Sequence, residues 1–323
     1  MTVVSILIVT HNSGREIGAC LDALQRHTRL DHEVILVDNA SGDTSLEIAK
    51  QCAGVRLLAN MENIGFAAAV NQAARLAQGR YLLLLNPDTR VHEQAVDRLA
   101  SYLDNRPAVG LCAPRVLAPD GRIRHNCFAF ETPWSFFWFG VGVGPLRHLR
   151  NWMLRRNRWD IAAATPQQVE AVTGAAMLVR RDLFEQLGGL DERFFMYCED
   201  GDFCLRARRA GWQTLLVPDA VVTHIGGASA PLDAPLLNGM LGEHLLRSRY
   251  RYTCKYWGHR TAWLLRWAYA VIGALCWLGG HVPLTGTTGA KLKAHGRLLW
   301  VTPILRTALD RTQADKPQPT QKR

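Results

Sequence analysis

The sequence lacks the glycine-rich loops with which many proteins hold the phosphates of a nucleotide. Neither G-x-x-x-x-G-K-[ST] nor G-x-G-x-x-G follows the first apolar run, at residues 3–9. Gly140, Gly142 and Gly144 follow aromatic residues rather than a strand, so we expect a flexible loop there. A bound diphosphate would therefore need another counter-charge, such as a divalent cation held by a carboxylate.

Features of secreted and zinc-binding proteins are also missing. The eight cysteines form no C-x-x-C pair, and their spacing indicates neither a zinc site nor a disulfide framework. The first ten residues contain no basic stretch and no small-residue cleavage site, so we interpret them as a core strand rather than a signal peptide. We expect reduced, buried thiols in a cytoplasmic protein.

Acidic residues are scarce in the last quarter of the chain. Residues 247–323 contain fourteen Lys and Arg but only Asp310 and Asp315 as acids, a net charge of +12. Because the whole chain carries +10, residues 1–246 carry −2. A basic segment of this kind favours an anionic lipid or a nucleic acid as its neighbour.

The first part of the chain alternates apolar strands with helices. Apolar residues fall at helical spacing between the predicted strands and again after the fourth one. This alternation predicts an α/β fold with a doubly wound, mostly parallel sheet. The four strands are predicted at residues 3–9, 34–37, 55–59 and 81–85.

The pattern changes from about Cys127. Aromatic residues crowd positions 128–139 without clear periodicity. Further on, we predict one strand over residues 169–179, a helix over 202–210 and a loop over 229–238.

A polar loop follows each of the first four predicted strands. These loops begin at Thr10, Asp38, Asn60 and Asn86. Ligands bind beyond the carboxyl ends of the strands in open α/β sheets, so the four loops would line one rim. Each loop alone could be an ordinary turn, because Asn, Asp, Ser and Gly form turns readily, but four in succession favour a ligand site.

An acidic cluster lies further along the chain. Glu199, Asp200 and Asp202 stand between an aromatic run and the predicted helix. Like charges in close proximity raise one another's pKa, which suits a general base. The alternative is an acidic helix N-terminus that the helix dipole stabilises. His224 follows a predicted strand, and a lone histidine there is either structural or a metal ligand.

Taken together, these segments resemble the glycosyltransferase family 2 enzymes of the GT-A fold. The resemblance is strongest to the bacterial rhamnosyltransferase-like branch that builds O-antigen and related surface polysaccharides. It covers roughly residues 3–230 and keeps the order of the motifs. The matching motifs are IVTHN at 8–12, VDNASGD at 37–43, NIGFAAAVN at 63–71, LLNPD at 84–88, TGAAMLVRR at 173–181, GGLDE at 188–192 and EDGD at 199–202.

The resemblance implies which residues bind the sugar donor. Thr10, Asn12 and Asp38 fall where the family binds the nucleoside, and a carboxylate there can accept a hydrogen bond from N3–H of uracil or thymine. A nucleotide diphosphate sugar, dTDP- or UDP-linked, is therefore the expected donor. The donor-binding set implied in full is Thr10, Asn12, Asp38, Asn63, Gly65, Phe66, Asn86 and Gly174.

The resemblance also implies a metal site and a base. Asn86-Pro87-Asp88 stands where many relatives have Asp-x-Asp, which makes Asp88 the expected ligand of Mg²⁺ or Mn²⁺. His224 matches a histidine that completes the metal site in some relatives. Asp200 matches the catalytic base that deprotonates the acceptor hydroxyl, with Glu199 and Asp202 as supporting residues.

The implied reaction is an inverting transfer of a sugar to a glycan or a polyprenyl-linked glycan, with dTDP-rhamnose as one candidate donor. The activated hydroxyl would attack C1 of the sugar in line with the leaving nucleoside diphosphate, and one displacement inverts the anomeric centre. Two alternatives remain. A catalytically inactive sugar-nucleotide-binding protein would share this fold. A nucleotidyltransferase would be expected to carry a glycine-rich, basic loop after the first strand.

The chain is predicted to consist of three parts. Residues 1–245 form a GT-A catalytic domain, with a donor half at about 1–115 and an acceptor half at about 116–245. Residues 246–312 form a basic, Trp-rich helical segment close to a membrane, and residues 313–323 form a disordered tail.

The stretch Trp267–Leu284 leaves three interpretations open. It has no charge apart from a possible one on His281, and basic residues flank it. It could lie in the membrane interface, span the bilayer, or pack on the catalytic domain. Nucleic acid is a less fitting partner, because an apolar helix is not a stacking platform. We expect a peripheral protein on an anionic membrane surface, at the inner face of the cell membrane.

Overall fold

The computed structural model describes residues 2–141, 159–226 and 240–279. Its contacts divide the chain into two units, which are described separately. The first unit comprises residues 1–131 and 157–231, and the second comprises residues 132–156 and 232–323. The boundary that we predicted at residue 245 remains a prediction.

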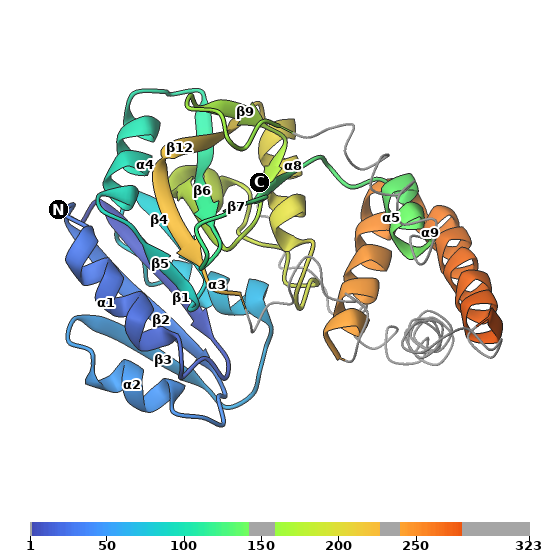
Figure 1. The fold of residues 1–323 in the computed structure, drawn as a ribbon, viewed down its shortest axis with the longest axis horizontal. Coiled ribbons are helices and arrows are strands. Elements are labelled where there is room, and N and C mark those ends of the chain that lie inside the picture. The colour runs from blue at the N-terminus through green and yellow to red at the C-terminus, as the bar shows by residue number, and fades with distance from the viewer. Residues whose placement is uncertain (1, 142–158, 227–239, 280–323) are drawn as a thin grey trace, which may run out of the picture. The chain divides into compact units, whose positions relative to one another are not determined.

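A mixed sheet of ten strands forms the framework of the first unit (Figure 1). Along its main path the strand order is β3-β2-β1-β4-β11-β6-β12-β5, with β7 on β6 and β9 on β12. The strands are β1 (Val4–Thr10), β2 (His32–Asn39), β3 (Val55–Asn60), β4 (Tyr81–Leu85), β5 (Thr89–Val91), β6 (Val109–Leu117), β7 (Ile123–Arg124), β9 (Gln167–Val169), β11 (Ala176–Arg180) and β12 (Gln213–His224).

The first four strands run parallel, and this aligns their carboxyl ends. The pairs β1–β2, β2–β3 and β1–β4 are all parallel, and Thr10 lies opposite Asp38 in the register. β6 and β12 also run parallel, whereas β11 is antiparallel to its neighbours β4 and β6. The predicted doubly wound, mostly parallel sheet is therefore confirmed.

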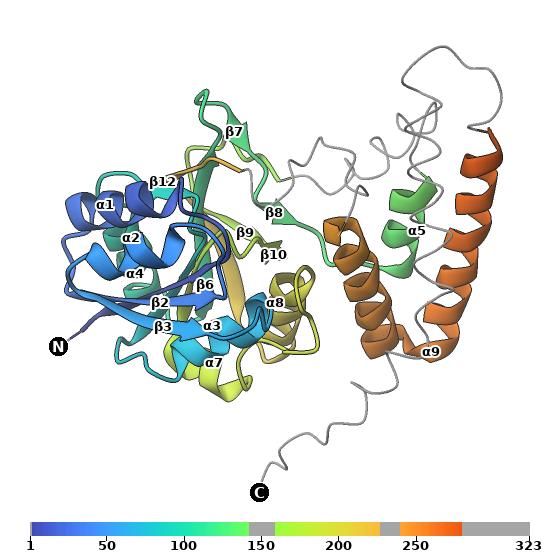
Figure 2. The same ribbon diagram turned by 90° about the horizontal axis from the view of Figure 1, so that it is seen from below.

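Helices cover both faces of this sheet because each strand alternates apolar side chains between them. Ile6 and Ile8 of β1 pack under α1, α2 and α4, while Leu7 and Val9 pack under α3, α7 and α8. Figure 2 shows α1, α2 and α4 on one side and α3 and α7 on the other. The helices are α1 (Ile17–His27), α2 (Ser45–Gln51), α3 (Phe66–Ala74), α4 (Ala95–Asp104), α7 (Arg181–Gln186) and α8 (Glu199–Arg209).

Two predicted elements differ in the structure. Residues 169–179 form not one strand but parts of three, β9, β10 (Ala171–Val172) and β11, and β10 pairs with β8 (Cys127–Phe128) outside the main sheet. The predicted helix at 202–210 begins three residues earlier, at Glu199, because Cys198 adopts a left-handed conformation that starts the helix there. Asp200 therefore lies in the first turn of α8. The predicted loop at 229–238 lies outside the described residues.

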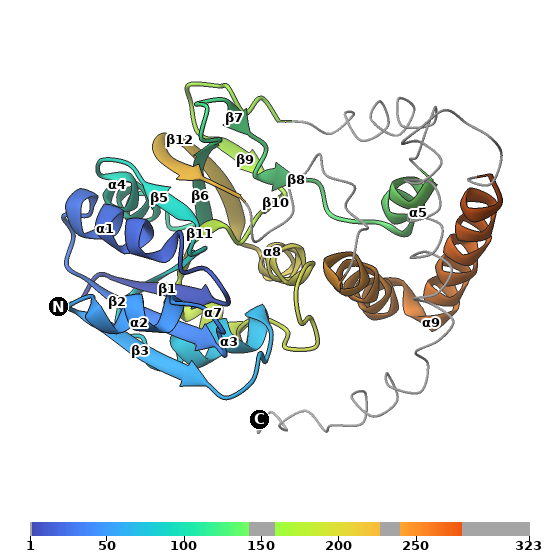
Figure 3. The same ribbon diagram turned by 60° about the horizontal axis from the view of Figure 1, so that its bottom comes forward.

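The second unit contains α5 (Pro133–Val141) and α9 (Met240–Gly279). The crowded aromatic residues at 133–141, for which we predicted no helix, form α5. Gly258 has φ 82° and bends α9 into two helical halves, as Figure 3 shows. Phe136 of α5 is fully buried, stacks edge-on against Tyr252, and accepts a hydrogen bond from the Tyr269 hydroxyl at its carbonyl.

Within the described ranges no helix is both long enough and apolar enough to cross a membrane. The described part of Trp267–Leu284, up to residue 279, belongs to the second half of α9. The predicted disordered tail, residues 313–323, lies outside the described residues.

Candidate active site

The polar residues predicted for one rim of the sheet do lie there. Thr10 ends β1, Asp38 lies next to the end of β2, and Asn86 follows β4 directly. Because these strands are parallel neighbours, their carboxyl ends lie together. His224 ends β12, which reaches the same region through its pairing with Thr89 of β5.

Thr10 and Asp38 offer unpaired polar atoms in a buried position. Thr10 is fully buried, and its hydroxyl oxygen has no hydrogen-bond partner among the described residues. Asp38 accepts a hydrogen bond from the Ser41 amide at Oδ2, at 3.0 Å, and its Oδ1 is left without a partner in that part of the chain. Burying such atoms costs free energy unless something bonds them, so these two suit a ligand that donates hydrogen bonds.

Asn12 shapes the loop beside this pair. Its backbone has φ 55°, its amide N–H donates to the Ser41 hydroxyl at 2.9 Å, and its side-chain oxygen accepts from Gly42 N–H at 2.8 Å. The loops after β1 and β2 are therefore bonded to each other. Asn12 itself is exposed.

The loop before α3 is fixed by backbone contacts. Asn63 accepts a hydrogen bond from the Gly65 amide at 3.0 Å, and the Phe66 amide donates to the carbonyl of Phe195 at 2.7 Å. Gly65 has φ 87°, and a Cβ at this position would lie 2.6 Å from that same carbonyl oxygen. Only glycine fits here, so the donor-loop motif and the segment before α8 are held in contact.

Asp88 and His224 form a buried pair. The Nε2 atom of His224 lies 3.0 Å from Oδ1 of Asp88, yet the two atoms are not in hydrogen-bond geometry. Both carboxylate oxygens and the imidazole nitrogen are therefore unsatisfied among the described residues, and Asp88 is 3% exposed. Two converging, desolvated ligand atoms of this chemistry fit one divalent cation.

Two protein ligands are too few to hold a cation alone. Among the residues that the structure describes, no cluster of three or more His, Cys, Asp or Glu side chains could bind a metal. Asn86, at the place of the first acid, uses its backbone to shape the turn: its amide donates to the Ala175 carbonyl, and its carbonyl accepts from Thr89. The remaining ligands would have to be water or the phosphate oxygens of a nucleotide.

Asp200 is held by backbone amides in a partly buried position. Its Oδ1 accepts from Gly201 N–H at 2.7 Å and its Oδ2 from Gly174 N–H at 3.2 Å. Burial raises the pKa of Asp200 to about 6, while these two hydrogen bonds lower it and the negative charge of Glu131 raises it further. A carboxylate with this pKa can take up a proton near neutral pH.

The two other acids of the cluster behave differently from each other. Glu199 is 7% exposed, and burial followed by the charge of Asp200 raises its pKa well above the usual range. Asp202 is fully buried and pairs with Arg206 at 2.8 Å. The same guanidinium donates to the carbonyls of Leu187 and Gly189, so Asp202 anchors the turn between α7 and α8.

Arg124 lies near the end of β12, close to His224, although the sequence analysis did not select it. A Cβ on Gly226, two residues after His224, would lie 2.7 Å from Nη1 of Arg124. The guanidinium is half-buried and has no ion-pair or hydrogen-bond partner among the described residues. Arg124 belongs to the two-residue strand β7, so no periodicity or motif could have indicated its position.

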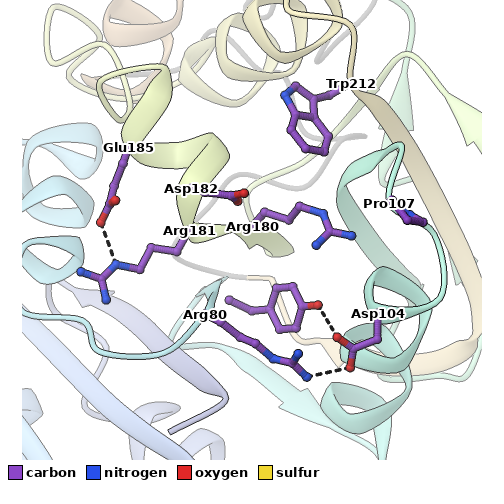
Figure 4. Close-up of a pocket in the computed structure, with 9 residues that line it drawn as sticks. Arg80, Asp104, Pro107, Arg180, Arg181, Asp182, Glu185 and Trp212 are labelled. Atoms are coloured by element: carbon purple, nitrogen blue, oxygen red, sulfur yellow. Dashed lines mark hydrogen bonds and ion pairs between the residues drawn. The ribbon is translucent and has the colours of Figure 1, made fainter. Parts of the chain in front are cut away.

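A separate cavity of about 480 Å³ lies at the opposite edge of the sheet (Figure 4). It contains Tyr81, at the start of β4, whereas the candidate site follows the end of that strand. Several of its side chains are paired within the protein: Arg80 and Tyr81 with Asp104, Arg181 with Glu185, and Arg180 with backbone carbonyls.

Comparison with known proteins identifies the family. Residues 5–188 match the family described as glycosyl transferase family 2. The chain belongs to glycosyltransferase family 2. It is 31% identical over 236 residues to the N-acetylglucosaminyl-diphospho-decaprenol L-rhamnosyltransferase of Mycobacterium tuberculosis, which covers 69% of this chain and 76% of the relative.

Solved structures confirm the GT-A fold that we predicted for this family 2 glycosyltransferase. A mannosyltransferase of Pyrobaculum calidifontis, in complex with GDP-Man and Mn²⁺, has a TM-score of 0.55 at 19% identity and covers 92% of this chain and 87% of its own. GalNAc-T7 with UDP, GalNAc and Mn²⁺ has a TM-score of 0.59 at 17% identity and covers 97% of this chain and 58% of its own.

The pKa of Asp200 generates a prediction for the pH dependence of transfer. A general base must be ionised, so kcat/KM should fall about tenfold per pH unit below pH 6 and level off above it.

Asp200→Asn should reduce kcat by roughly 10²-fold or more without abolishing donor binding. Steady-state kinetics between pH 5 and 8.5 would measure both effects.

The matched control is Glu185→Gln, which changes a carboxylate at the opposite edge of the sheet and should leave the profile unchanged. Wild-type turnover by Asp200→Asn would show that another group accepts the proton.

Proposed function

We propose that this glycosyltransferase is an inverting enzyme that moves a sugar from a dTDP- or UDP-linked donor to a polyprenyl-linked glycan. The observation that carries the proposal is the Asp200 carboxylate, which two backbone amides orient and burial brings to a pKa of about 6. The likeness to a rhamnosyltransferase named for a decaprenol-linked acceptor supports rhamnose as the sugar and a lipid-linked glycan as the acceptor.

The nucleoside would bind between the ends of β1 and β2. Asp38 would accept N3–H of uracil or thymine at its unpaired Oδ1, and the Thr10 hydroxyl would bond the same base. The donor sugar and diphosphate would lie along the loop of Asn63, Gly65 and Phe66, towards Gly174. The contact between Gly174 N–H and Asp200 supports this arrangement because it joins the donor side to the base.

A divalent cation, Mg²⁺ or Mn²⁺, would be held by Asp88 and His224 together with the donor. When bound, it would supply positive charge against the diphosphate as that group leaves. The Mn²⁺ bound in both solved neighbours supports this assignment. Asp88 and His224 could bind one cation without rearrangement, because Oδ1 of Asp88 and Nε2 of His224 already lie 3.0 Å apart.

Asp200 would accept the proton of the acceptor hydroxyl as that oxygen attacks C1 of the sugar. The bond between C1 and the diphosphate oxygen breaks in the same displacement, so the anomeric configuration inverts. Glu199 would stay protonated beside Asp200, because burial raises its pKa and the pair cannot easily hold two charges. Asp202 would act only through Arg206, by fixing the turn before α8.

Arg124 would complete the neutralisation of the leaving diphosphate. Its unpaired guanidinium lies against Gly226, next to the end of β12 that carries His224. A half-buried guanidinium without a partner pairs readily with phosphate oxygens. Arg122, two residues away, is instead exposed and paired with Asp120 at 2.7 Å.

Neither alternative function gains support. A nucleotidyltransferase is disfavoured by the family match and by the missing glycine-rich loop. An inactive sugar-nucleotide-binding protein would have no use for an ionisable carboxylate that backbone amides hold at the acceptor side. We further propose that the protein works in cell-surface polysaccharide assembly, as a peripheral protein on the cytoplasmic face of the cell membrane.

Transfer assays with a panel of donors test the proposed reaction. Purified protein with Mn²⁺ should transfer from dTDP-rhamnose or a UDP-sugar to a polyprenyl diphosphate-linked N-acetylglucosamine, and NMR should show that the anomeric configuration is inverted. Donor binding without transfer or hydrolysis, for every donor, would favour the inactive binding protein. A retained configuration would contradict a single displacement.

The Arg124 proposal has its own matched pair of variants. Arg124→Gln should weaken binding of the nucleoside diphosphate roughly tenfold or more, since it removes a charge-assisted hydrogen bond. Arg122→Gln, which removes an exposed arginine from the same hairpin, should leave the affinity unchanged. Equal affinities of both variants, measured by calorimetry, would place Arg124 outside the diphosphate site.

A further inference from the structure

The second half of α9 has an exposed face that is entirely apolar. We call this face the α9 stripe; it recurs at helical spacing and therefore lies along one side of the helix. Each of its side chains is at least 49% exposed. The α9 stripe consists of Trp263, Leu264, Trp267, Val271, Leu275 and Leu278.

The opposite face of the same helix is already occupied. Ala262, Leu265, Tyr269 and Ala270 are buried, and the Tyr269 hydroxyl donates to the carbonyl of Phe136 in α5. Apart from Thr261 and Arg266, residues 261–279 of this helix are apolar, with one face packed inside its own unit and the other exposed. An exposed apolar surface of this extent marks a site of interaction with a protein or a membrane.

The distribution of charge selects a membrane over a second copy of the chain. Between residues 261 and 279 Arg266 is the single charged residue, whereas Arg251, Lys255 and Arg260 precede the stripe. Residues 247–323 carry a net charge of +12, so two copies packed through this segment would bring like charges together. An anionic bilayer would attract the same charges while it covers the apolar side chains.

The stripe is too short to cross a bilayer. From Trp263 to Leu278 the helix rises by about 22 Å, which is short of the roughly 30 Å of a hydrocarbon core. Trp263 and Trp267 contact each other at the end nearest the basic residues, with ring centroids 5.9 Å apart. Tryptophan prefers the headgroup level, next to the lysines and arginines that bind lipid phosphates.

We propose that the α9 stripe inserts into one leaflet of an anionic bilayer and lies in its interface. The headgroups contact the basic residues that precede it, the two tryptophans lie at headgroup level, and Val271, Leu275 and Leu278 face the acyl chains. The inference deepens the proposed function, on which it rests for its purpose: a surface-bound enzyme would meet a polyprenyl-linked acceptor in the same membrane.

Vesicle flotation of the full chain tests this proposal. Wild-type protein should float with vesicles of phosphatidylglycerol and phosphatidylcholine, and less with phosphatidylcholine alone or in 1 M NaCl, because salt screens the charges. The double variant Trp267→Ser/Leu275→Ser should lower the partition coefficient about tenfold or more. Met61→Ser is the control: Met61 is 98% exposed in the first unit and should not affect flotation.

Two further measurements separate the alternatives. Calorimetric binding of a nucleoside diphosphate should be the same in the stripe variant and the wild type, which shows that the first unit is intact. The flotation itself contains no donor or acceptor, so its failure would not bear on sugar transfer. A second copy of the chain would be the partner of the stripe if two results came together. The wild-type protein would not float, and it would form a dimer in ultracentrifugation that the double variant does not form. Binding that survives an alkaline wash would indicate a spanning segment and would also overturn the proposal.

Discussion

The constraint on which this structure depends is the cost of burying carboxylates at one rim of a sheet. Asp38, Asp88, Glu199 and Asp202 are all less than 9% exposed, and Asp200 is held against backbone amides. Asp202 has a guanidinium partner, but atoms of Asp38, Asp88 and Glu199 have none among the described residues. Unsatisfied buried groups destabilise a protein and persist where a ligand uses them. The rim is therefore destabilised when no substrate is bound. Asp38 would bind the nucleoside and Asp88 the cation, while Glu199 would stay protonated beside Asp200.

Backbone and side-chain hydrogen bonds together connect the loop before α3 to the segment that precedes Asp200. The carbonyl of Phe195 accepts a hydrogen bond from the Phe66 amide, and it lies so close to Gly65 that no side chain would fit there. Asn71 of α3 bonds both the amide and the carbonyl of Leu190, and Arg206 bonds Gly189 next to it. The segment from Gly188 to Asp200 is thus fixed at both ends. Tyr197 and Cys198 then adopt left-handed conformations, at φ 70° and 68°, immediately before the acidic cluster.

The sequence was sufficient for the parts of the fold that follow periodicity. The strands of the parallel half were predicted to within a few residues, because apolar runs such as 81–85 end at polar turns. The aromatic stretch at 133–141 could not be assigned, since apolar residues on every side of the helix leave no period to detect. Thr10, Asp38 and Asn86 were expected at one edge of the sheet and lie at the ends of parallel strands there, while their roles remain predictions. The position of Arg124 beside Gly226 depends on a contact between distant segments. Such contacts, with the pairing of three short strands at 167–180, are tertiary properties that no local pattern encodes.

We expect Asp88 and His224, whose facing atoms have no hydrogen-bond partner among the described residues, to bind a cation together with a nucleoside diphosphate. Isothermal titration calorimetry with UDP and dTDP, with and without Mn²⁺, measures it most directly. Mn²⁺ should strengthen binding to the wild type by about tenfold or more, because the cation offsets the diphosphate charge. Asp88→Ala should lose this gain, whereas Asp182→Ala, a carboxylate change at the opposite edge, should keep it. Equal affinity of the wild type with and without Mn²⁺ would contradict the claim and indicate a metal-independent site.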